Sequence, residues 1–300
     1  MDFPLVSIVM PSFNQDVFLD AAIDSVLNQN YPNLELIVAD GASSDNSVAL
    51  IKRRQQQDQR IRWFSRKDRG PAHAINDAMA MVRGTTIGWL NSDDLFSADA
   101  ISYAVNALSA HPDWLMVYGH GQHVDANAQF LSDYPTLPPT SGAARFQQGC
   151  FICQPTLFMR RTARLLLGPL DETLRASFDF EYWLRAFAAF PDRIGFIERV
   201  QAYSRLHADC ITMRLRRIIA LEGMKVLARY QGYASPEWLL SYVKETLLET
   251  DVNTDWGKLT QDFTQSVVEA SNWMTMHDKV QLEKNIALQL KHRRAALGER

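Results

Sequence analysis

Residues 89–96 read WLNSDDLF, where an apolar run ends in an amide, a hydroxyl and two adjacent carboxylates before hydrophobic residues resume. The run closes a short segment, residues 85–90, whose composition is that of a buried strand. Asp93 and Asp94 repel each other at the tip of this strand. The stretch therefore indicates either a turn or helix-start role for the two carboxylates, or a binding site that uses them.

The same pattern of strand and polar end recurs along the first 110 residues. Short apolar segments alternate with segments that carry apolar residues at helical spacing. We expect strands over 5–10, 34–39, 61–64 and 85–90, and helices over 16–29, 44–58, 72–83 and 97–110, the last with Ser97 as its N-cap. This alternation predicts an α/β fold with a mainly parallel sheet flanked by helices.

Polar residues follow all four predicted strands. Right-handed crossovers place the carboxyl ends of parallel strands on one edge of a sheet, and ligands of such folds bind at that edge. The segments that meet there are Pro11–Asn14, Asp40–Asp45, Arg66–Gly70 and Asn91–Asp94. The adjacent carboxylates thus belong to a shared crevice, which favours the binding site.

The residues of this crevice indicate metal-assisted phosphate chemistry. The sequence has neither G-x-x-x-x-G-K-[ST] nor a G-x-G-x-x-G after its first strand, so the usual triphosphate and dinucleotide motifs are missing. Adjacent carboxylates suit a hard divalent cation such as Mg²⁺ or Mn²⁺, and Arg66, Lys67 or Arg69 would balance the charge of a phosphate. Together these groups are typical of the activation of a nucleotide leaving group.

Beyond residue 110 the alternation is less regular. Further strands are expected over 115–118 and 151–160, and an amphipathic helix over 180–190, preceded by Asp179. From about residue 213 the composition is almost entirely helical. We therefore expect a division of the chain near residue 212.

The composition excludes several classes of protein. A net charge of −3 gives no electrostatic case for nucleic-acid binding. No apolar run approaches the roughly 20 residues of a membrane-spanning helix, and no basic leader precedes the first apolar run, so we expect no signal peptide. The three cysteines, including the pair Cys150 and Cys153 that we interpret as buried thiols in a strand, indicate a reducing compartment. A cytoplasmic protein is expected.

Six segments of the chain resemble family 2 glycosyltransferases. VSIVMPSFNQ, LELIVADGASSDNS, KDRGPAHAINDAM and GWLNSDDL resemble the nucleotide-binding half of these enzymes. DETLRASFDFEYWLRA and YSRLHADCIT resemble the acceptor half of bacterial members that build surface polysaccharides. The resemblance covers about residues 4–212 in the family's motif order. It implies the GT-A fold and inverting transfer of a sugar from a nucleotide diphosphate, with a UDP-sugar as the favoured donor.

The resemblance also implies a division of the chain and a class of acceptor. The acceptor would be a hydroxyl of a glycan or of a lipid-linked molecule. Two other functions stay open: a sugar-phosphate nucleotidyltransferase, which would also use a parallel sheet and a carboxylate–metal site, and a catalytically inactive module that binds nucleotide sugars. The expected parts are a nucleotide-binding half over 1–110, an acceptor half over 111–212, and a helical C-terminal extension over 213–300.

The resemblance assigns roles in the donor pocket. Asp40 would accept a hydrogen bond from the base, typically from uracil N3–H, or serve a turn of its own loop. Asp68 and Arg69 would lie near the ribose and phosphates. Gly41 is a departure, since many members have a second aspartate there. The residues implied to line the nucleotide pocket are Pro11, Ser12 and Asn14.

The turn Asn91–Asp94 occupies the family's DxD position. Asn91, Ser92 and Asp93 fill the three places, Asp93 matching the aspartate that binds Mn²⁺ or Mg²⁺. Asp94 matches a frequent third acidic residue. Asn91 stands where many members have aspartate, which removes one charge from the site.

Three later residues complete the implied site. Asp179 matches the aspartate that serves as catalytic base, although its position also suits a helix cap. Glu181 is the competing carboxylate. His207 is either a metal ligand, an acceptor contact or a structural histidine.

Basic residues are frequent in the C-terminal helical region, over 214–229 and 291–294. Basic amphipathic helices can lie on an anionic membrane, and lipid-linked acceptors are common among the enzymes that this chain resembles. The alternative is that these helices pack together and leave their basic faces in water. A peripheral contact at the inner face of the membrane is thus one of two interpretations.

Overall fold

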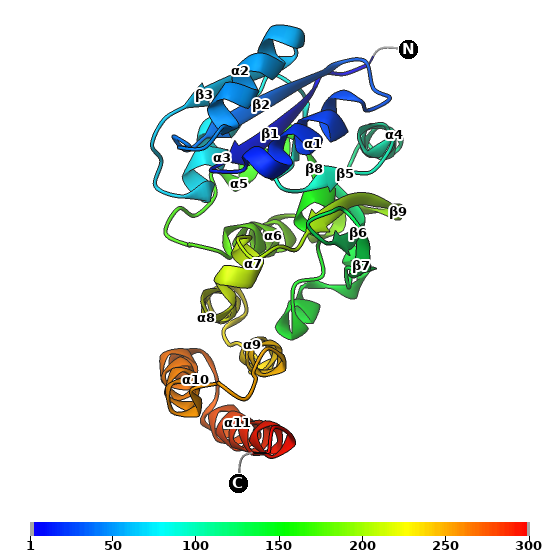
Figure 1. Ribbon diagram of the computed structural model, residues 1–300. Helices are drawn as coiled ribbons and strands as arrows, with labels where there is room; N and C mark the ends of the chain where they lie inside the picture. Colours follow the sequence, from blue (N-terminus) through cyan, green and yellow to red (C-terminus); the bar gives the residue numbers. More distant parts are fainter. Residues whose placement is uncertain (1–2, 299–300) are drawn as a thin grey trace. The chain divides into compact units, whose positions relative to one another are not determined.

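The computed structural model describes residues 3–298, which form two compact units (Figure 1). The α/β unit comprises the residues up to Gly142 together with Phe151–Cys210. The helical unit comprises Ala143–Cys150 and the residues from Ile211 onward.

The first strands of the α/β unit are parallel. They lie side by side in the order β3-β2-β1-β4, and the register pairs Ser12 with Asp40. The predicted parallel sheet is therefore confirmed, and the polar segments after these strands lie at one edge. The four strands are β1 (Val6–Ser12), β2 (Leu34–Asp40), β3 (Ile61–Ser65) and β4 (Thr86–Trp89).

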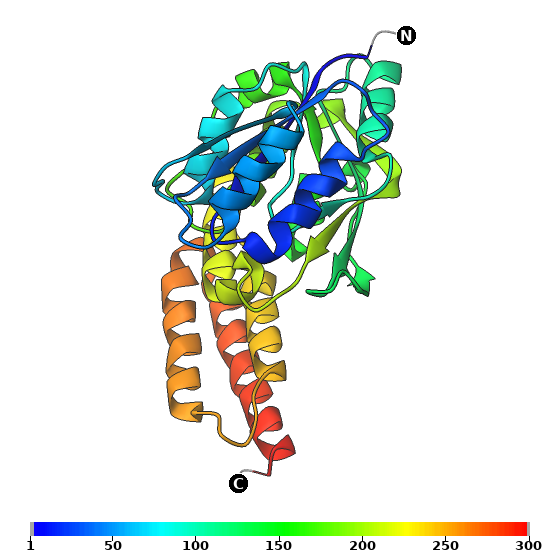
Figure 2. The ribbon, with the colours of Figure 1, turned by 45° about the horizontal axis from the view of Figure 1, so that its top comes forward.

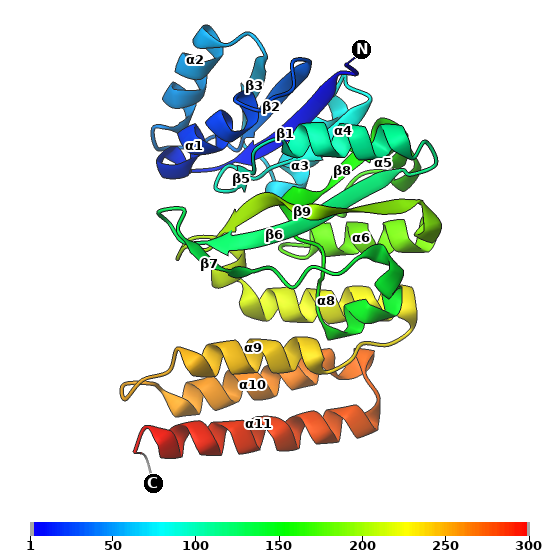
Figure 3. The same cartoon turned by 90° about the vertical axis from the view of Figure 1, so that its right-hand side faces the viewer.

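The rest of the sheet mixes directions, as Figure 3 shows. It continues from β4 in the order β8-β6-β9-β5. Strand β8 is antiparallel to both of its neighbours, β6 and β9 are parallel, and β5 is antiparallel to β9. Strand β7 pairs with the end of β6. The bounds are β5 (Leu95–Phe96), β6 (Met116–Val124), β7 (Phe130–Asp133), β8 (Phe158–Arg160) and β9 (Ile194–Arg205).

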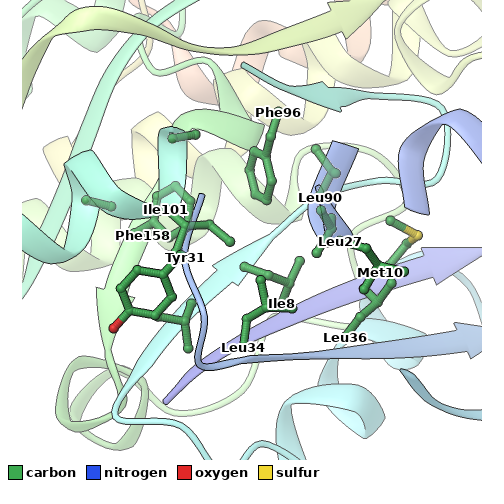
Figure 4. Close-up of a cluster of buried hydrophobic side chains, with 14 of the residues drawn as sticks. Ile8, Met10, Leu27, Tyr31, Leu34, Leu36, Leu90, Phe96, Ile101 and Phe158 are labelled. Carbon is green, nitrogen blue, oxygen red and sulfur yellow. The ribbon is translucent and has the colours of Figure 1, made fainter. Parts of the chain in front are cut away.

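Helices cover both faces of the parallel strands. Side chains alternate along β1, so Ile8 and Met10 pack in one cluster with α1 and α4 (Figure 4), while α3 contacts β1 and β2. Figure 2 shows α1 and α2 lying over the sheet. Burial of each such Ile or Leu side chain contributes about 1.5–3 kcal/mol. The helices are α1 (Asp16–Leu27), α2 (Ser47–Gln57), α3 (Pro71–Ala80), α4 (Ala100–Ala110), α5 (Arg161–Leu167) and α6 (Phe178–Ala189).

The prediction that Ser97 caps a helix is wrong. Helix α4 begins at Ala100, after Asp99 in the left-handed conformation with φ 60°. The Oγ of Ser97 instead donates to the carbonyl of Val200 at 2.6 Å, and its N–H donates to the carbonyl of Gln201 at 2.9 Å. Ser97 follows β5, so its hydrogen bonds are used to extend the contact with β9.

Two expected bounds in the second half of the α/β unit are also wrong. Only Phe158–Arg160 of the segment 151–160 is a strand. A 3-10 turn over Gln154–Thr156 precedes it, because Pro155 has no N–H for a strand ladder. Helix α6 begins at Phe178, so Asp179 lies within its first turn and does not precede it.

The helical unit confirms the helical composition of the C-terminal third. Its last two long helices start with caps, since Asp255 accepts from the N–H of Lys258 and Thr275 accepts from the N–H of Asp278. None of the helices within residues 3–298 has both the length and the apolar composition needed to cross a membrane. The helices are α7 (Ile211–Arg214), α8 (Arg216–Gln231), α9 (Glu237–Leu248), α10 (Trp256–Ala270) and α11 (Met276–Ala296).

Candidate functional site

The loops after β1 and β2 are joined by hydrogen bonds. Asn14 adopts a left-handed conformation with φ 51°, and its N–H donates to the Oγ of Ser43 at 2.8 Å. Its Oδ1 accepts from the N–H of Ser44 at 2.9 Å. Asn14 thus fixes one polar strand end against the next.

Asp40 is the anchor of its own loop. The residue is 1% exposed, and its carboxylate accepts from the Oγ and N–H of Ser43 at 2.5 and 3.0 Å. It also accepts from the Oγ of Ser65 at 2.5 Å. These bonds hold the ends of β2 and β3 together, which is the turn role that the sequence left open. A contact between Asp40 and a base stays a prediction.

The space above Gly41 is bordered by Phe13 and Asp68. Phe13 is 59% exposed, and the Oδ1 of Asp68 accepts from the N–H of Gly70 at 2.9 Å. The neighbouring Ser12 is buried, and its Oγ has no hydrogen-bond partner within the described residues. The strand ends thus leave an exposed ring and an unpaired hydroxyl beside the loop anchor, Pro11 lying just before them on β1.

The basic residues of the third loop contact carboxylates. Arg69 forms an ion pair with Glu172, and Arg66 pairs with Asp77 at 2.6 Å. Hydrogen bonds from Asn76 and from Arg69 hold the pKa of Glu172 below its usual value. Arg69 is thus held by Glu172 through one guanidinium nitrogen, while 70% of its side chain stays exposed.

Asn91 is bonded at both ends of its amide. Its Oδ1 accepts from the Nε1–H of Trp89 at 3.0 Å. Its Nδ2 donates to the Oδ2 of Asp94 at 3.2 Å and to the Oε1 of Gln154 at 3.0 Å. Gln154 in turn donates to the carbonyl of Trp89 at 2.8 Å. Sequence reasoning missed Gln154, which lies 63 residues away in the chain from Asn91 and has no motif around it.

Asp94 is a buried carboxyl beside a second one. Its Oδ1 accepts from the N–H of Arg205 at 2.8 Å. Burial, and then the charge of Asp93, raise the pKa of Asp94 well above its usual value. Ser92 is buried as well. The turn thus holds Asp93, which is half-buried, next to two buried residues.

His207 lies against Asp93. The Nε2 of His207 is 3.0 Å from the Oδ2 of Asp93, and Arg205 donates to the carbonyl of Asp93 at 2.7 Å. The ring of Phe18 contacts both, at 4.6 Å from the His207 ring and 4.8 Å from the Arg205 guanidinium. Arg205 and Phe18 were not predicted: Arg205 lies in the segment YSRLHADCIT but was given no role there, and Phe18 lies outside the segments that carry the resemblance.

These residues fit a divalent cation as a two-ligand site. No group of three or more His, Cys, Asp or Glu side chains within residues 3–298 has metal-binding geometry. A carboxylate oxygen and an imidazole nitrogen are both ordinary ligands of divalent cations, so Asp93 and His207, whose Oδ2 and Nε2 lie at a hydrogen-bond distance of 3.0 Å, are the residues that would hold the cation.

Asp179 and Glu181 lie in the first turn of α6. The Oδ1 of Asp179 accepts from the N–H of Phe180 at 2.7 Å. The adjacent Phe178 stacks on Trp89 with ring centres 5.9 Å apart, so this turn lies beside the end of β4. Glu181 is buried and forms an ion pair with Arg185, which neutralises the competing carboxylate.

An α/β sheet of this strand order, with an acidic turn after its fourth parallel strand, is the GT-A architecture. The chain belongs to glycosyltransferase family 2: the family model described as "Glycosyl transferase family 2" matches residues 7–165, just over half of the chain.

Proteins of similar sequence are glycosyltransferases or larger synthases. An uncharacterized glycosyltransferase of Haemophilus influenzae is 30% identical over 170 residues, which are 56% of this chain and 68% of that protein. A chondroitin synthase of Escherichia coli is 26% identical over 182 residues, 61% of this chain. The match spans only 26% of that synthase, and 30% of an uncharacterized glycosyltransferase of Rickettsia bellii.

Solved structures share the fold at low sequence identity. The structure of S. aureus TarS 1-349 in complex with UDP has a TM-score of 0.60 and 15% identity, covering 96% of this chain and 89% of that one. The mannosyltransferase PcManGT from Pyrobaculum calidifontis, in complex with GDP-Man and Mn²⁺, has a TM-score of 0.59 and 18% identity, with coverages of 98% and 83%.

Proposed function

We propose that this chain is an inverting glycosyltransferase that moves a sugar from a UDP-sugar to a hydroxyl of a glycan or lipid-linked acceptor, in the synthesis of a cell-surface polysaccharide. The observation that carries the proposal is the pair Asp93 and His207, 3.0 Å apart at the edge of the parallel strands. The family supports sugar transfer. The bound UDP of TarS and the GDP-Man and Mn²⁺ of PcManGT support a nucleotide-sugar donor and a metal.

On the donor side, Asp93 and His207 would hold the cation, Mn²⁺ or Mg²⁺. Bound there, the cation would offset the negative charge that develops on the departing diphosphate. Arg205 fixes the main chain of Asp93 through its carbonyl. The buried hydrogen bonds of Asn91 and Asp94 hold the rest of the turn, so the donor meets a site whose geometry is set in advance.

On the acceptor side, Asp179 would act as the base. It would take the proton of the acceptor hydroxyl as that oxygen attacks the anomeric carbon. A single displacement inverts the configuration and needs no covalent intermediate. The N-terminal turn of α6 favours a negative charge on Asp179, whereas the carboxylate of Glu181 is neutralised by Arg185.

The test replaces each carboxylate by its amide. Asp179→Asn keeps the acceptor oxygen for the N–H of Phe180, so the helix should fold while turnover falls by about 100-fold or more, the usual cost of a lost general base. Glu181→Gln is the matched control and should keep turnover within a few-fold. The assay measures release of UDP from UDP-sugars with a glycan acceptor and Mn²⁺, together with donor affinity, which Asp179→Asn should not change.

Two outcomes would contradict the proposal. An active Asp179→Asn beside a folded but inactive Glu181→Gln would make Glu181 the base. Release of pyrophosphate from a nucleoside triphosphate and a sugar phosphate, without transfer from any UDP-sugar, would show a nucleotidyltransferase instead.

A further inference from the structure

Gly41 marks a close approach of three loops. A β-carbon placed on Gly41 would lie 2.7 Å from the Oδ2 of Asp68 and 3.2 Å from the Cδ2 of Phe13. Gly41 is not among the glycines with positive φ, so its backbone accepts any residue. What excludes a side chain is the carboxylate of Asp68, which fills the space above the α-carbon.

The two groups over Gly41 have unused binding capacity. The Oδ1 of Asp68 accepts from Gly70, whereas no hydrogen bond to its Oδ2 is found within residues 3–298. Phe13 exposes 59% of its surface, and an exposed ring of this size favours a stacking partner. An exposed ring beside an acceptor that lacks a donor is complementary to a flat molecule that carries an N–H at its edge.

Asp40, the alternative acceptor, offers neither property. It is 1% exposed, and its oxygens already receive three hydrogen bonds from Ser43 and Ser65. A base that approached Asp40 would have to displace these bonds, each of which is made to a buried charged group.

We propose that Asp68, and not Asp40, selects the base of the donor, with Asp68 Oδ2 accepting the N3–H of uracil and Phe13 covering the face of the ring. This inference rests on the proposed function. Cytosine presents a lone pair at N3, which the carboxylate repels. Guanine presents N1–H and an amino group side by side and would use two oxygens, but Oδ1 already accepts from Gly70. The site therefore favours UDP over CDP and GDP.

The first experiment is a calorimetric titration of UDP, CDP and GDP into the full chain with Mn²⁺. The wild type should bind UDP at least tenfold more tightly than CDP, since a charge-assisted hydrogen bond contributes roughly 10- to 100-fold in affinity. Asp68→Asn should remove most of this ratio, because its amide can donate to cytosine N3. Asp77→Asn is the matched control and should keep the ratio of UDP to CDP affinity. It removes a carboxylate of α3 that pairs with Arg66, a residue of the same loop as Asp68.

A second experiment moves the carboxylate from residue 68 to residue 41, on the other side of the same space. Gly41→Asp alone should weaken UDP binding, since its side chain meets Asp68. The double variant Gly41→Asp/Asp68→Gly should recover the preference for UDP over CDP. Recovery would support a carboxylate acting on the base, because a purely structural role of Asp68 would not survive the exchange.

Three results would overturn the inference. They are an unchanged UDP-to-CDP ratio in folded Asp68→Asn, a loss of the ratio in Asp40→Asn but not in Asp68→Asn, and a wild type that prefers GDP. Each leaves the proposed function standing if UDP-sugars are still turned over. A wild type that binds none of the nucleotides would instead remove the proposed function, and this inference with it.

Discussion

A single amide sets the geometry of the acidic turn. Asn91 donates to the carboxylate of Asp94 and to the carbonyl oxygen of the Gln154 side chain, and an aspartate at this place could donate to neither. Asp94 is already a buried carboxyl whose pKa is raised by burial and by Asp93. The asparagine thus keeps a third carboxyl group out of a turn that already holds two, which gives this departure from the family pattern a physical reason.

Asn91→Asp should therefore impair the site although it restores the aspartate expected from the family resemblance. It leaves buried acceptors unpaired, at a cost of about 1–3 kcal/mol, and we expect a lower melting temperature and at least tenfold weaker Mn²⁺–UDP binding. The double variant Asn91→Asp/Asp94→Asn exchanges the amide and the carboxyl group. It restores one donor–acceptor pair, so it should regain part of the melting temperature and part of the Mn²⁺–UDP affinity. Binding would be followed by Mn²⁺ electron paramagnetic resonance. Tighter metal binding by Asn91→Asp would show that residue 91 is a ligand and not a support.

Asp93 should act on the donor only through the metal. Asp93→Ala removes the carboxylate that lies 3.0 Å from His207, so UDP affinity should fall at least tenfold in Mn²⁺ and change little in EDTA. His207→Ala should show the same pattern to a smaller degree, since an imidazole adds no negative charge. Titrations of UDP into each variant, in Mn²⁺ and in EDTA, measure both effects. Equal weakening with and without metal would place Asp93 in direct contact with the nucleotide.

At the scale of elements, strand β2 carries a buried carboxylate that links three segments. Glu35 accepts from the Oγ of Ser7 on β1 at 2.6 Å, from Arg62 on β3 at 2.8 Å and from the N–H of Arg83 at 2.8 Å. Burial by itself raises the pKa of Glu35, but the hydrogen bonds from Ser7, Arg62 and Arg83 outweigh it and lower the pKa below 4.5. The carboxylate thus stabilises the parallel strands in its charged form.

Glu35→Gln should destabilise the α/β unit in a pH-dependent way. Because the folded pKa lies below the unfolded value, the charged group contributes stability above about pH 4.3 and loses it as the pH falls through the folded pKa. Urea unfolding at pH 7 should show a loss of about 1–3 kcal/mol in the variant, and the difference should shrink as the pH falls below about 4.3. Glu198→Gln, at an exposed position of β9, serves as control. A constant difference at all pH values would mean that shape and not charge matters at this position.

At the scale of the whole molecule, two basic residues of the helical unit form ion pairs within that unit. Arg216 pairs with Glu249 at 2.7 Å, and Arg217 pairs with Glu269 at 2.8 Å and donates to Ser266. These contacts favour packed helices over a basic face that lies on a membrane. Membrane contact and a cytoplasmic location stay predictions.

Arg217→Ala should accordingly lower stability and leave membrane affinity unchanged. Loss of a partly buried ion pair costs about 1 kcal/mol, so the melting temperature should fall by roughly 2–5 °C. In flotation with vesicles, wild type and variant should behave alike in neutral and in anionic lipid. Binding of the wild type that requires anionic lipid, fades with salt and is lost in Arg217→Ala would establish the membrane interpretation.

The sequence by itself determined the parallel half of the sheet and the edge at which its polar segments gather. Apolar runs of strand length that alternate with helical spacing leave few ways to bury both faces of the strands, and right-handed crossovers then fix which ends meet. For this reason Asp40 and Asp93 could be assigned to one crevice before any coordinates. The same local reasoning failed for Ser97 and for residues 151–160, where partners on β9 and a proline override the local pattern.

The tertiary structure alone decided which side chains complete the site. His207 and Asp93 are 114 residues apart in the chain, and Asn91 and Gln154 are 63 apart. These contacts depend on the pairing of β5 with β9 and on the packing of Phe178 against Trp89. Hydrogen bonds between distant strands follow from burial summed over the whole sheet and leave no periodic trace in the sequence. A pattern can therefore place an acidic turn at an edge, but only the folded chain shows which histidine meets its carboxylate.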